Sequence, residues 1–195
     1  MNGKEKTTRI FLTMNNIIKF LTAGSVDDGK STLIGKLLYD TGSIYDDQID
    51  QIKELGNGEI DYSLFVEGLE SERRQKITID VAYRYFTHDN SKFIIADSPG
   101  HEQYTKNMAV AAANSDIAVI LIDAKSGVKT QTVRHSYIAH LFGIKHFIIA
   151  VNKMDSVLYS QEILRSIKKE YINKTSFLVD RDISFIPISA TKSDN

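Results

Sequence analysis

A glycine-rich run that could bind phosphate lies at Gly24–Ser31, where the sequence reads G-x-x-x-x-G-K-S. It follows the apolar stretch Ile17–Ala23 and precedes a helical pattern. Glycines at this spacing let the backbone wrap around phosphate oxygens with its N–H groups turned inward, and the start of the helix adds a favourable dipole. Lys30 is expected to reach the β- and γ-phosphates, and the Ser31 hydroxyl to ligate Mg²⁺. The predicted phosphate-binding residues are Gly24, Ser25, Val26, Asp27, Asp28, Gly29, Lys30, Ser31 and Thr32.

A second candidate motif, Asp97–Gly100, directly follows the apolar stretch Phe93–Ala96. A carboxylate at the end of a strand can hold a Mg²⁺-bound water, and the glycine would let a backbone N–H approach the γ-phosphate. The spacing D-x-x-G is common in turns and is informative only beside a phosphate-binding loop. His101 comes next and is expected to orient the attacking water. The candidate catalytic residues are therefore His101, Lys30 and Asp97.

Thr78 is the remaining candidate metal ligand, together with Ser31 and Asp97. Its hydroxyl and carbonyl would reach Mg²⁺ and the γ-phosphate only when a triphosphate is bound. That would make the segment Asp40–Thr78 an order–disorder switch. Without the other motifs, Thr78 is an ordinary strand threonine.

The sequence Asn152-Lys153-Met154-Asp155, after the apolar stretch Phe147–Val151, predicts recognition of a guanine base. The Asp155 carboxylate can accept both the N1–H and the exocyclic N2–H₂ of guanine, whereas adenine offers no matching pair of donors. A buried acceptor left unpaired is costly, so the wrong base should be rejected. Lys153 would lie along the base, and Asn152 would tie this loop to the phosphate-binding loop. Ser189-Ala190 could donate backbone N–H groups to guanine O6, so GTP or GDP is the expected cofactor, with Mg²⁺.

Short apolar runs rich in β-branched residues alternate with helical patterns along the chain. This alternation predicts βαβ units and a three-layer α/β sandwich of the P-loop NTPase type, with a mostly parallel sheet. Asp80–Phe86 and Lys92–Ala96 flank a turn and predict a hairpin with one antiparallel edge strand. The expected buried strands are Ile17–Ala23, Phe93–Ala96, Ile117–Asp123, Phe147–Val151 and Phe185–Ile188, and the expected helices are Ser31–Tyr39, Tyr104–Ala113, Gln131–Leu141 and Gln161–Ile172.

Two further expectations concern segments without a clear motif. Asp40–Glu70 has the weakest apolar periodicity and is expected to form little structure of its own. His88, His135, His140 and His146 lack functional neighbours in the sequence, and we expect them to be surface or partly buried residues.

Composition limits the classes of protein that remain. A chain of 195 residues suggests one domain, for which we expect residues 16–195, with residues 1–15 as an N-terminal extension. The net charge of −1 argues against general nucleic-acid binding, and zero cysteines exclude disulfides and thiolate metal sites. No apolar run approaches the roughly 18 residues of a membrane span, so no membrane association and a cytoplasmic location are expected.

The order of these motifs resembles that of GTP-binding proteins. Gln75–Asp80 and Asp97–Glu102 resemble the translation-factor-like class of GTPases. Within that class, the longer strings Gly24–Asp40, Thr78–Phe86 and His101–Met108 are similar to the large, GTP-hydrolysing subunit of bacterial sulfate adenylyltransferase. The likeness covers about residues 17–195, and elongation factors usually differ at Asp28.

The resemblance implies a regulatory subunit in which GTP hydrolysis is coupled to adenylylsulfate synthesis from ATP and sulfate. It also implies a separate catalytic partner, subunit 2, and β-barrel domains beyond this chain, which would then be truncated. A monovalent cation near Asp27 is a further implication. Two residues depart from the family pattern, Lys76 in place of glycine and Ser98 in place of threonine.

Two alternatives stay open: a translational switch that binds ribosomes and tRNA, and a GTP-binding module without catalysis. The net charge of −1 and Asp28 weigh against the first alternative. A switch stiffened at Lys76 would favour the second.

Overall fold

A computed structural model describes residues 17–55, 60–66, 80–192 and 194. Its centre is a six-stranded sheet with the strand order β2-β3-β1-β4-β5-β6. Only β2 and β3 pair antiparallel, and every other neighbouring pair is parallel. The predicted sheet and its antiparallel edge strand are thus confirmed. The strands are β1 Ile17–Ala23, β2 Ala82–His88, β3 Ser91–Asp97, β4 Ile117–Asp123, β5 His146–Asn152 and β6 Asp182–Pro187.

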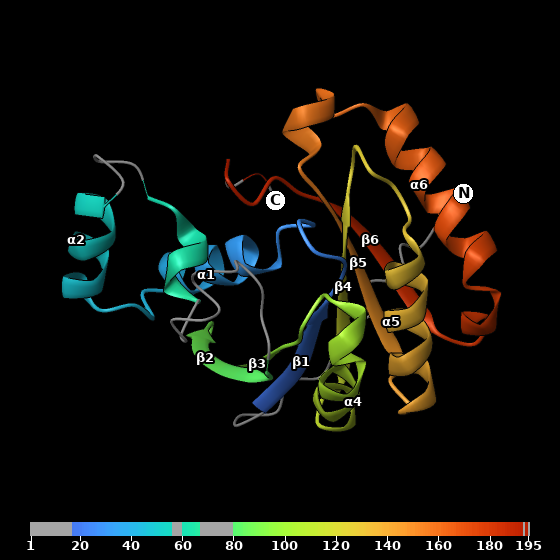
Figure 1. Ribbon diagram of the computed structural model, residues 1–195, viewed down its shortest axis with the longest axis horizontal. Coiled ribbons are helices and arrows are strands. Elements are labelled where there is room, and N and C mark those ends of the chain that lie inside the picture. The colour runs from blue at the N-terminus through green and yellow to red at the C-terminus, as the bar shows by residue number, and fades with distance from the viewer. Residues whose placement is uncertain (1–16, 56–59, 67–79, 193, 195) are drawn as a thin grey trace, which may run out of the picture.

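Helices cover both faces of the sheet and complete the predicted three layers (Figure 1). Helix α1 lies on one face, and α4, α5 and α6 pack on the other (Figure 1). The helices are α1 Lys30–Asp40, α2 Asp46–Leu55, α4 Thr105–Ala113, α5 Thr130–Leu141 and α6 Gln161–Lys174, with short 3₁₀ turns η1 Tyr62–Phe65, η2 Glu102–Tyr104, η3 Met154–Val157 and η4 Ser176–Leu178. None of the helices in the described part of the chain is both long and apolar enough to cross a membrane.

Strands β4 and β5 are buried because helices and neighbouring strands enclose them. Side chains such as Ile120, Leu121 and Ile149 are completely buried, and each contributes about 1.5–3 kcal/mol through the hydrophobic effect. A second cluster beneath α1 joins Phe20, Ile34 and Ile95. These apolar contacts fix the strand ends from which the motif loops emerge.

The strand order reverses at β1, which lies between β3 and β4. The crossover from β1 to β3 carries α1 on one face, and the crossover from β3 to β4 carries α4 on the other. In open α/β sheets, a crevice forms at the carboxyl ends of the strands at such a reversal. The glycine-rich loop begins at this point.

Four sequence-based expectations needed correction. The strand expected to be buried at Phe185–Ile188 is β6, which lies at the edge of the sheet, and its residues are exposed or half-buried. The segment 40–70 contains α2 and η1, although the apolar residues of α2 are few; Ile52 is buried. The hairpin turn is shorter than expected, because Asp89 and Asn90 both adopt positive φ and close a two-residue turn. His135 is completely buried on the core-facing side of α5, which the spacing of Thr132, His135 and Ala139 would have revealed.

Candidate nucleotide-binding site

The glycine-rich loop connects β1 to α1 and turns sharply at its two glycines. Gly29 has a φ of 90°, and a Cβ at this position would collide with Asn152 Nδ2. Any other residue at position 29 would therefore have an unfavourable backbone conformation and a steric clash with Asn152. The residues Lys30, Ser31 and Thr32 form the first turn of α1, so its free N–H groups point toward the crevice. Val26 and Asp27 lie at the outer bend of the loop.

The Lys30 ammonium lies inside this loop. Its Nζ donates to the carbonyl oxygens of Gly24 at 3.3 Å and Ser25 at 3.1 Å, and only 8% of the residue is exposed. Burial lowers the pKa of Lys30, while the nearby carboxylates of Asp97 and Asp28 act in the opposite direction. Phosphate oxygens could replace the two carbonyl acceptors and compensate the buried charge more fully.

Gly100 brings the second motif against the phosphate loop. A Cβ on this residue would lie 2.5 Å from Lys30 Nζ and 3.0 Å from the Gly24 carbonyl oxygen. The absence of a side chain therefore allows close approach of the two loops. His101 follows directly; it is half-buried, and its Nδ1 accepts from the Gln103 amide at 3.4 Å.

Asp97 lies at the end of β3 and is 1% exposed. Its Oδ1 accepts from the Thr22 hydroxyl at 3.3 Å, which anchors the carboxylate to β1. Ser98 fits its position, since it is fully buried and its hydroxyl donates to the Thr22 carbonyl at 2.6 Å.

The predicted metal ligands are hard oxygen donors of the kind that Mg²⁺ prefers, namely a carboxylate at Asp97 and a hydroxyl at Ser31. The third, Thr78, lies outside the described residues, as does Lys76. No group of three or more His, Asp or Glu side chains that could hold a metal occurs in the described ranges. A carboxylate and a hydroxyl are donors that Mg²⁺ can take beside phosphate oxygens and water.

Asn152 joins three loops through its side chain. Its Nδ2 donates to the Asp28 carbonyl at 3.0 Å, and its Oδ1 accepts from the Ala190 amide at 3.1 Å. The side chain is 2% exposed, so both hydrogen bonds are shielded from water. The phosphate loop, the loop after β5 and the loop after β6 are thereby held in one arrangement.

Lys153 and Asp155 lie in the same loop as Asn152. Lys153 Nζ donates to the Asp27 carbonyl at 2.6 Å and pairs with Asp123 at 2.9 Å. Burial raises the pKa of the Asp123 carboxyl, but Lys153 and two backbone amides outweigh it, so the pKa lies below its ordinary value. Asp155 Oδ1 accepts from the Ser189 hydroxyl at 2.7 Å, which fixes the orientation of the carboxylate.

Sequence reasoning missed three residues that hold this site together. Thr22 supports Asp97, Asp123 pairs with Lys153, and Lys129 pairs with Asp28 at 2.7 Å. None of the three belongs to a recognised motif, and Lys129 is 101 residues from its partner in the chain. Such pairings follow from the fold and have no local signal.

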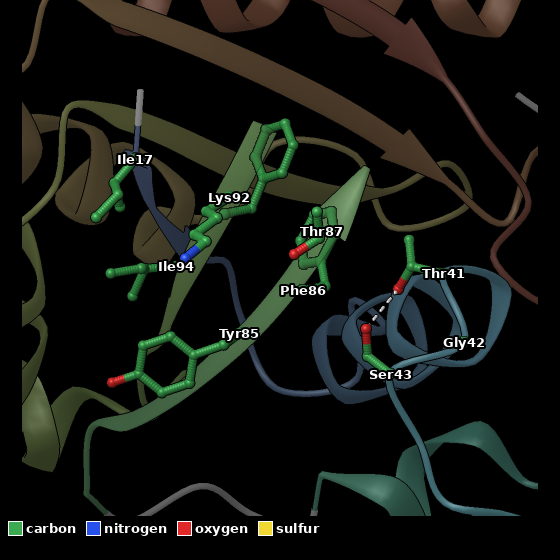
Figure 2. Close-up of a pocket in the computed structure, with 10 residues that line it drawn as sticks. Ile17, Thr41, Gly42, Ser43, Tyr85, Phe86, Thr87, Lys92 and Ile94 are labelled. Atoms are coloured by element: carbon green, nitrogen blue, oxygen red, sulfur yellow. Dashed lines mark hydrogen bonds between the residues drawn. The ribbon is translucent and has the colours of Figure 1, made fainter. Parts of the chain in front are cut away.

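A hollow of about 620 Å³ is lined by none of the motif residues. Figure 2 shows the residues that line it. Its lining includes Ile17 at the start of β1, Thr41 and Ser43 after α1, and Thr87 and Lys92 beside the hairpin turn. These positions lie at the opposite end of the sheet from the motif loops, because they are at the first residues of β1 and β3, at the end of β2, or after α1.

The fold, with a glycine-rich loop between β1 and α1 and an Asn-Lys-Met-Asp loop after β5, defines a P-loop GTPase domain. Residues 15–195 match the family model described as elongation factor Tu GTP binding domain. The chain belongs to this family.

Among curated proteins, the chain is 58% identical over 185 residues to "Sulfate adenylyltransferase subunit 1" of Francisella tularensis subsp. novicida. It is 60% identical over 185 residues to the protein of the same name from Colwellia psychrerythraea. Each match covers 92% of this chain, but 39% and 40% of the respective relative. The chain thus spans about two fifths of the length of these relatives.

Among solved structures, the bacterial selenocysteine-specific elongation factor EF-Sec is 29% identical, with a TM-score of 0.69 over 90% of this chain and 26% of the other. The Saccharomyces cerevisiae Ski7 GTPase-like domain, bound to GDP and inorganic phosphate, is 21% identical with a TM-score of 0.76 over 91% of this chain and 44% of the other. The second likeness concerns the fold alone.

Proposed function

We propose that the chain is the GTP-binding and GTP-hydrolysing part of a sulfate adenylyltransferase, where it couples GTP hydrolysis to adenylylsulfate synthesis from ATP and sulfate. The observation that carries the nucleotide site is the pair of hydrogen bonds from Asn152, which join the phosphate loop to both candidate base loops. The sulfate adenylyltransferase context rests on relatives that are 55–60% identical and bear that name.

In this proposal, the amides of Gly24–Thr32 and the Lys30 ammonium bind the phosphates. Ser31, Thr78 and Asp97 would hold Mg²⁺, and the ion would supply positive charge beside the phosphate oxygens. The base is recognised by Asp155, with Lys153 alongside it and the amides of Ser189-Ala190 near O6.

His101 orients the attacking water in the proposed reaction. It directly follows Gly100, which lies against Lys30, the residue that would reach the β- and γ-phosphates in this proposal. Catalysis of this kind depends on placement and charge stabilisation, because the protein forms no covalent bond to the phosphoryl group.

We also propose a partner and a location. The relatives are named subunit 1, and the chemistry of adenylyl transfer would belong to a catalytic subunit 2. A cytoplasmic location agrees with a sequence that contains no cysteine. The monovalent cation expected near Asp27 fits less well, since the Asp27 carbonyl already accepts from the Lys153 ammonium.

A translational role is the second candidate, because EF-Sec is 29% identical over most of the chain. The identity to the sulfate adenylyltransferase relatives is about twice as high, which favours the first proposal. Co-sedimentation of the GTP-bound protein with ribosomes would support the translational role instead.

The test uses the natural full-length protein together with its catalytic partner. GTP should stimulate adenylylsulfate synthesis, and His101→Ala should lose about a hundredfold or more of GTP turnover while GTP affinity is retained. His88→Ala, at the exposed end of β2, is the matched control and should hydrolyse GTP normally. Synthesis that is indifferent to GTP would refute the coupling, and unchanged turnover in His101→Ala would remove His101 from the reaction.

A further inference from the structure

An ion pair between a buried carboxylate and a partly exposed lysine connects the phosphate loop to the start of α5. The Asp28 carboxylate is 1% exposed, and both of its oxygens are hydrogen-bonded. Oδ2 accepts from the Ser25 amide at 2.7 Å, within the loop itself. Oδ1 accepts from Lys129 Nζ at 2.7 Å, and Lys129 is the residue immediately before α5. The loop is therefore fixed by a charged group that comes from a distant part of the chain.

Asp28 presents an electrostatic problem for a loop that binds phosphate. A carboxylate beside the expected phosphates would repel them unless an opposite charge compensates it. Burial raises the pKa of Asp28 above its ordinary value, and the hydrogen bond and charge of Lys129, the Ser25 amide and the charge of Lys30 oppose this rise. Lys129 is the cation that is hydrogen-bonded to this carboxylate, and its charge favours the ionised form of Asp28.

The connection between β4 and α5 also reaches the base loop. Asp123, the last residue of β4, pairs with Lys153 at 2.9 Å. The same connection, residues 124–129, ends at Lys129 and its pair with Asp28. Two ion pairs therefore bound this connection. Asp123 before it pairs with Lys153 of the base loop, and Lys129 at its end pairs with Asp28 of the phosphate loop.

We propose that Lys129 is a positioning residue for nucleotide binding: its ammonium neutralises Asp28 and holds the phosphate loop in the form that accepts an anion. Lys129 acts through Asp28 and does not need to touch the nucleotide. The inference rests on the proposed guanine-nucleotide site, and it adds a residue that lies outside all of the sequence motifs.

The experiment measures GDP binding to the natural full-length protein by calorimetry. Lys129→Met should weaken GDP binding by about tenfold or more, because an uncompensated carboxylate remains beside the phosphates. Lys129→Arg keeps the charge and should stay within about threefold of the unaltered protein. Lys125→Met, an exposed lysine in the same connection, is the matched control and should bind GDP normally.

A double variant separates charge from simple loss of structure. Asp28→Asn combined with Lys129→Met removes both charges and keeps a side-chain oxygen for the Ser25 amide. It should recover most of the affinity that Lys129→Met loses. If Lys129→Met does not fold, Lys129→Gln, which also removes the positive charge, replaces it in both GDP-binding comparisons.

The outcomes distinguish the two proposals. Equal GDP affinity in the unaltered protein and Lys129→Met would overturn the positioning role alone. A double variant as weak as Lys129→Met would also overturn it, because the defect would not then be one of charge. If the unaltered protein binds no guanine nucleotide, the proposed function itself fails.

Discussion

The protein should become less stable in mild acid, because the unfolded chain takes up a proton at His135 and the folded protein does not. The imidazole is completely buried in α5, and burial, followed by the charges of Lys30 and Arg134, lowers its pKa from 6.5 to about 4. Below about pH 6.5 the unfolded chain binds a proton at this histidine that the folded protein does not bind. Stability is therefore lost as the pH falls from about 6.5 toward 4, and there is no penalty above that range.

The size of the effect follows from the same shift. Each pKa unit corresponds to about 1.4 kcal/mol, so the penalty at this histidine approaches about 3 kcal/mol in the acid limit and is about 2 kcal/mol near pH 5. His135→Leu has a similar volume and cannot titrate. Its free energy of unfolding should therefore fall by about 2 kcal/mol less than that of the unaltered protein between about pH 7.5 and pH 5.

Urea denaturation of both proteins at the two pH values measures this difference. His88→Leu is the control, because this histidine is exposed on the hairpin, and its loss of stability with acid should match that of the unaltered protein. Carboxylates titrate in all three proteins, so their contribution cancels in the comparison. Identical acid dependence in His135→Leu and the unaltered protein would refute the reasoning.

Three further predictions concern the site itself. Asp155→Asn should shift the preference from guanine to xanthine nucleotides in competition binding, and retained guanine preference would contradict the base assignment. Asn152→Ala should lower the free energy of unfolding in urea by about 2–4 kcal/mol, because it leaves a buried carbonyl and a buried amide unpaired; a loss below about 1 kcal/mol would contradict this role. Gly100→Ala should weaken GTP binding in a fluorescence titration, since its methyl group would press on Lys30 and the phosphate loop, and unchanged affinity would show that the loops can separate freely.

Local patterns predicted most of the fold because the central strands β1, β4 and β5 are short, apolar and largely buried. The bounds of β1 and β4 agree with the expected Ile17–Ala23 and Ile117–Asp123. Helix α2 escaped prediction because most of its residues are charged or polar and its apolar positions are few. The 3₁₀ turn η1 depends on contact with α1, where a Cβ at Gly35 would overlap the Tyr62 carbonyl.

The residues of the candidate site were predictable where chemistry dictates a spacing, as in Gly24–Ser31. The residues that support them were not, because their partners are far away in the chain. Thr22 lies 75 residues from Asp97, and Asp28 lies 101 residues from Lys129. A strand threonine and a loop lysine look ordinary until the fold brings them to the crevice.

The phosphate loop is held by hydrogen bonds to its main-chain carbonyls and by one ion pair between side chains, and substitutions affect these two kinds of contact differently. Asn152 and Lys153 both donate to main-chain carbonyls, those of Asp28 and Asp27. A carbonyl is present whatever residue occupies the position, so this link between the base and phosphate loops can persist through substitutions in the glycine-rich run. The pair of Asp28 with Lys129 requires two particular side chains and is lost when either changes. The hydrogen bonds to main-chain carbonyls therefore do not depend on which side chains the phosphate loop carries. The Asp28–Lys129 pair does, so substitutions at these two residues can change the phosphate loop without removing its link to the base loop.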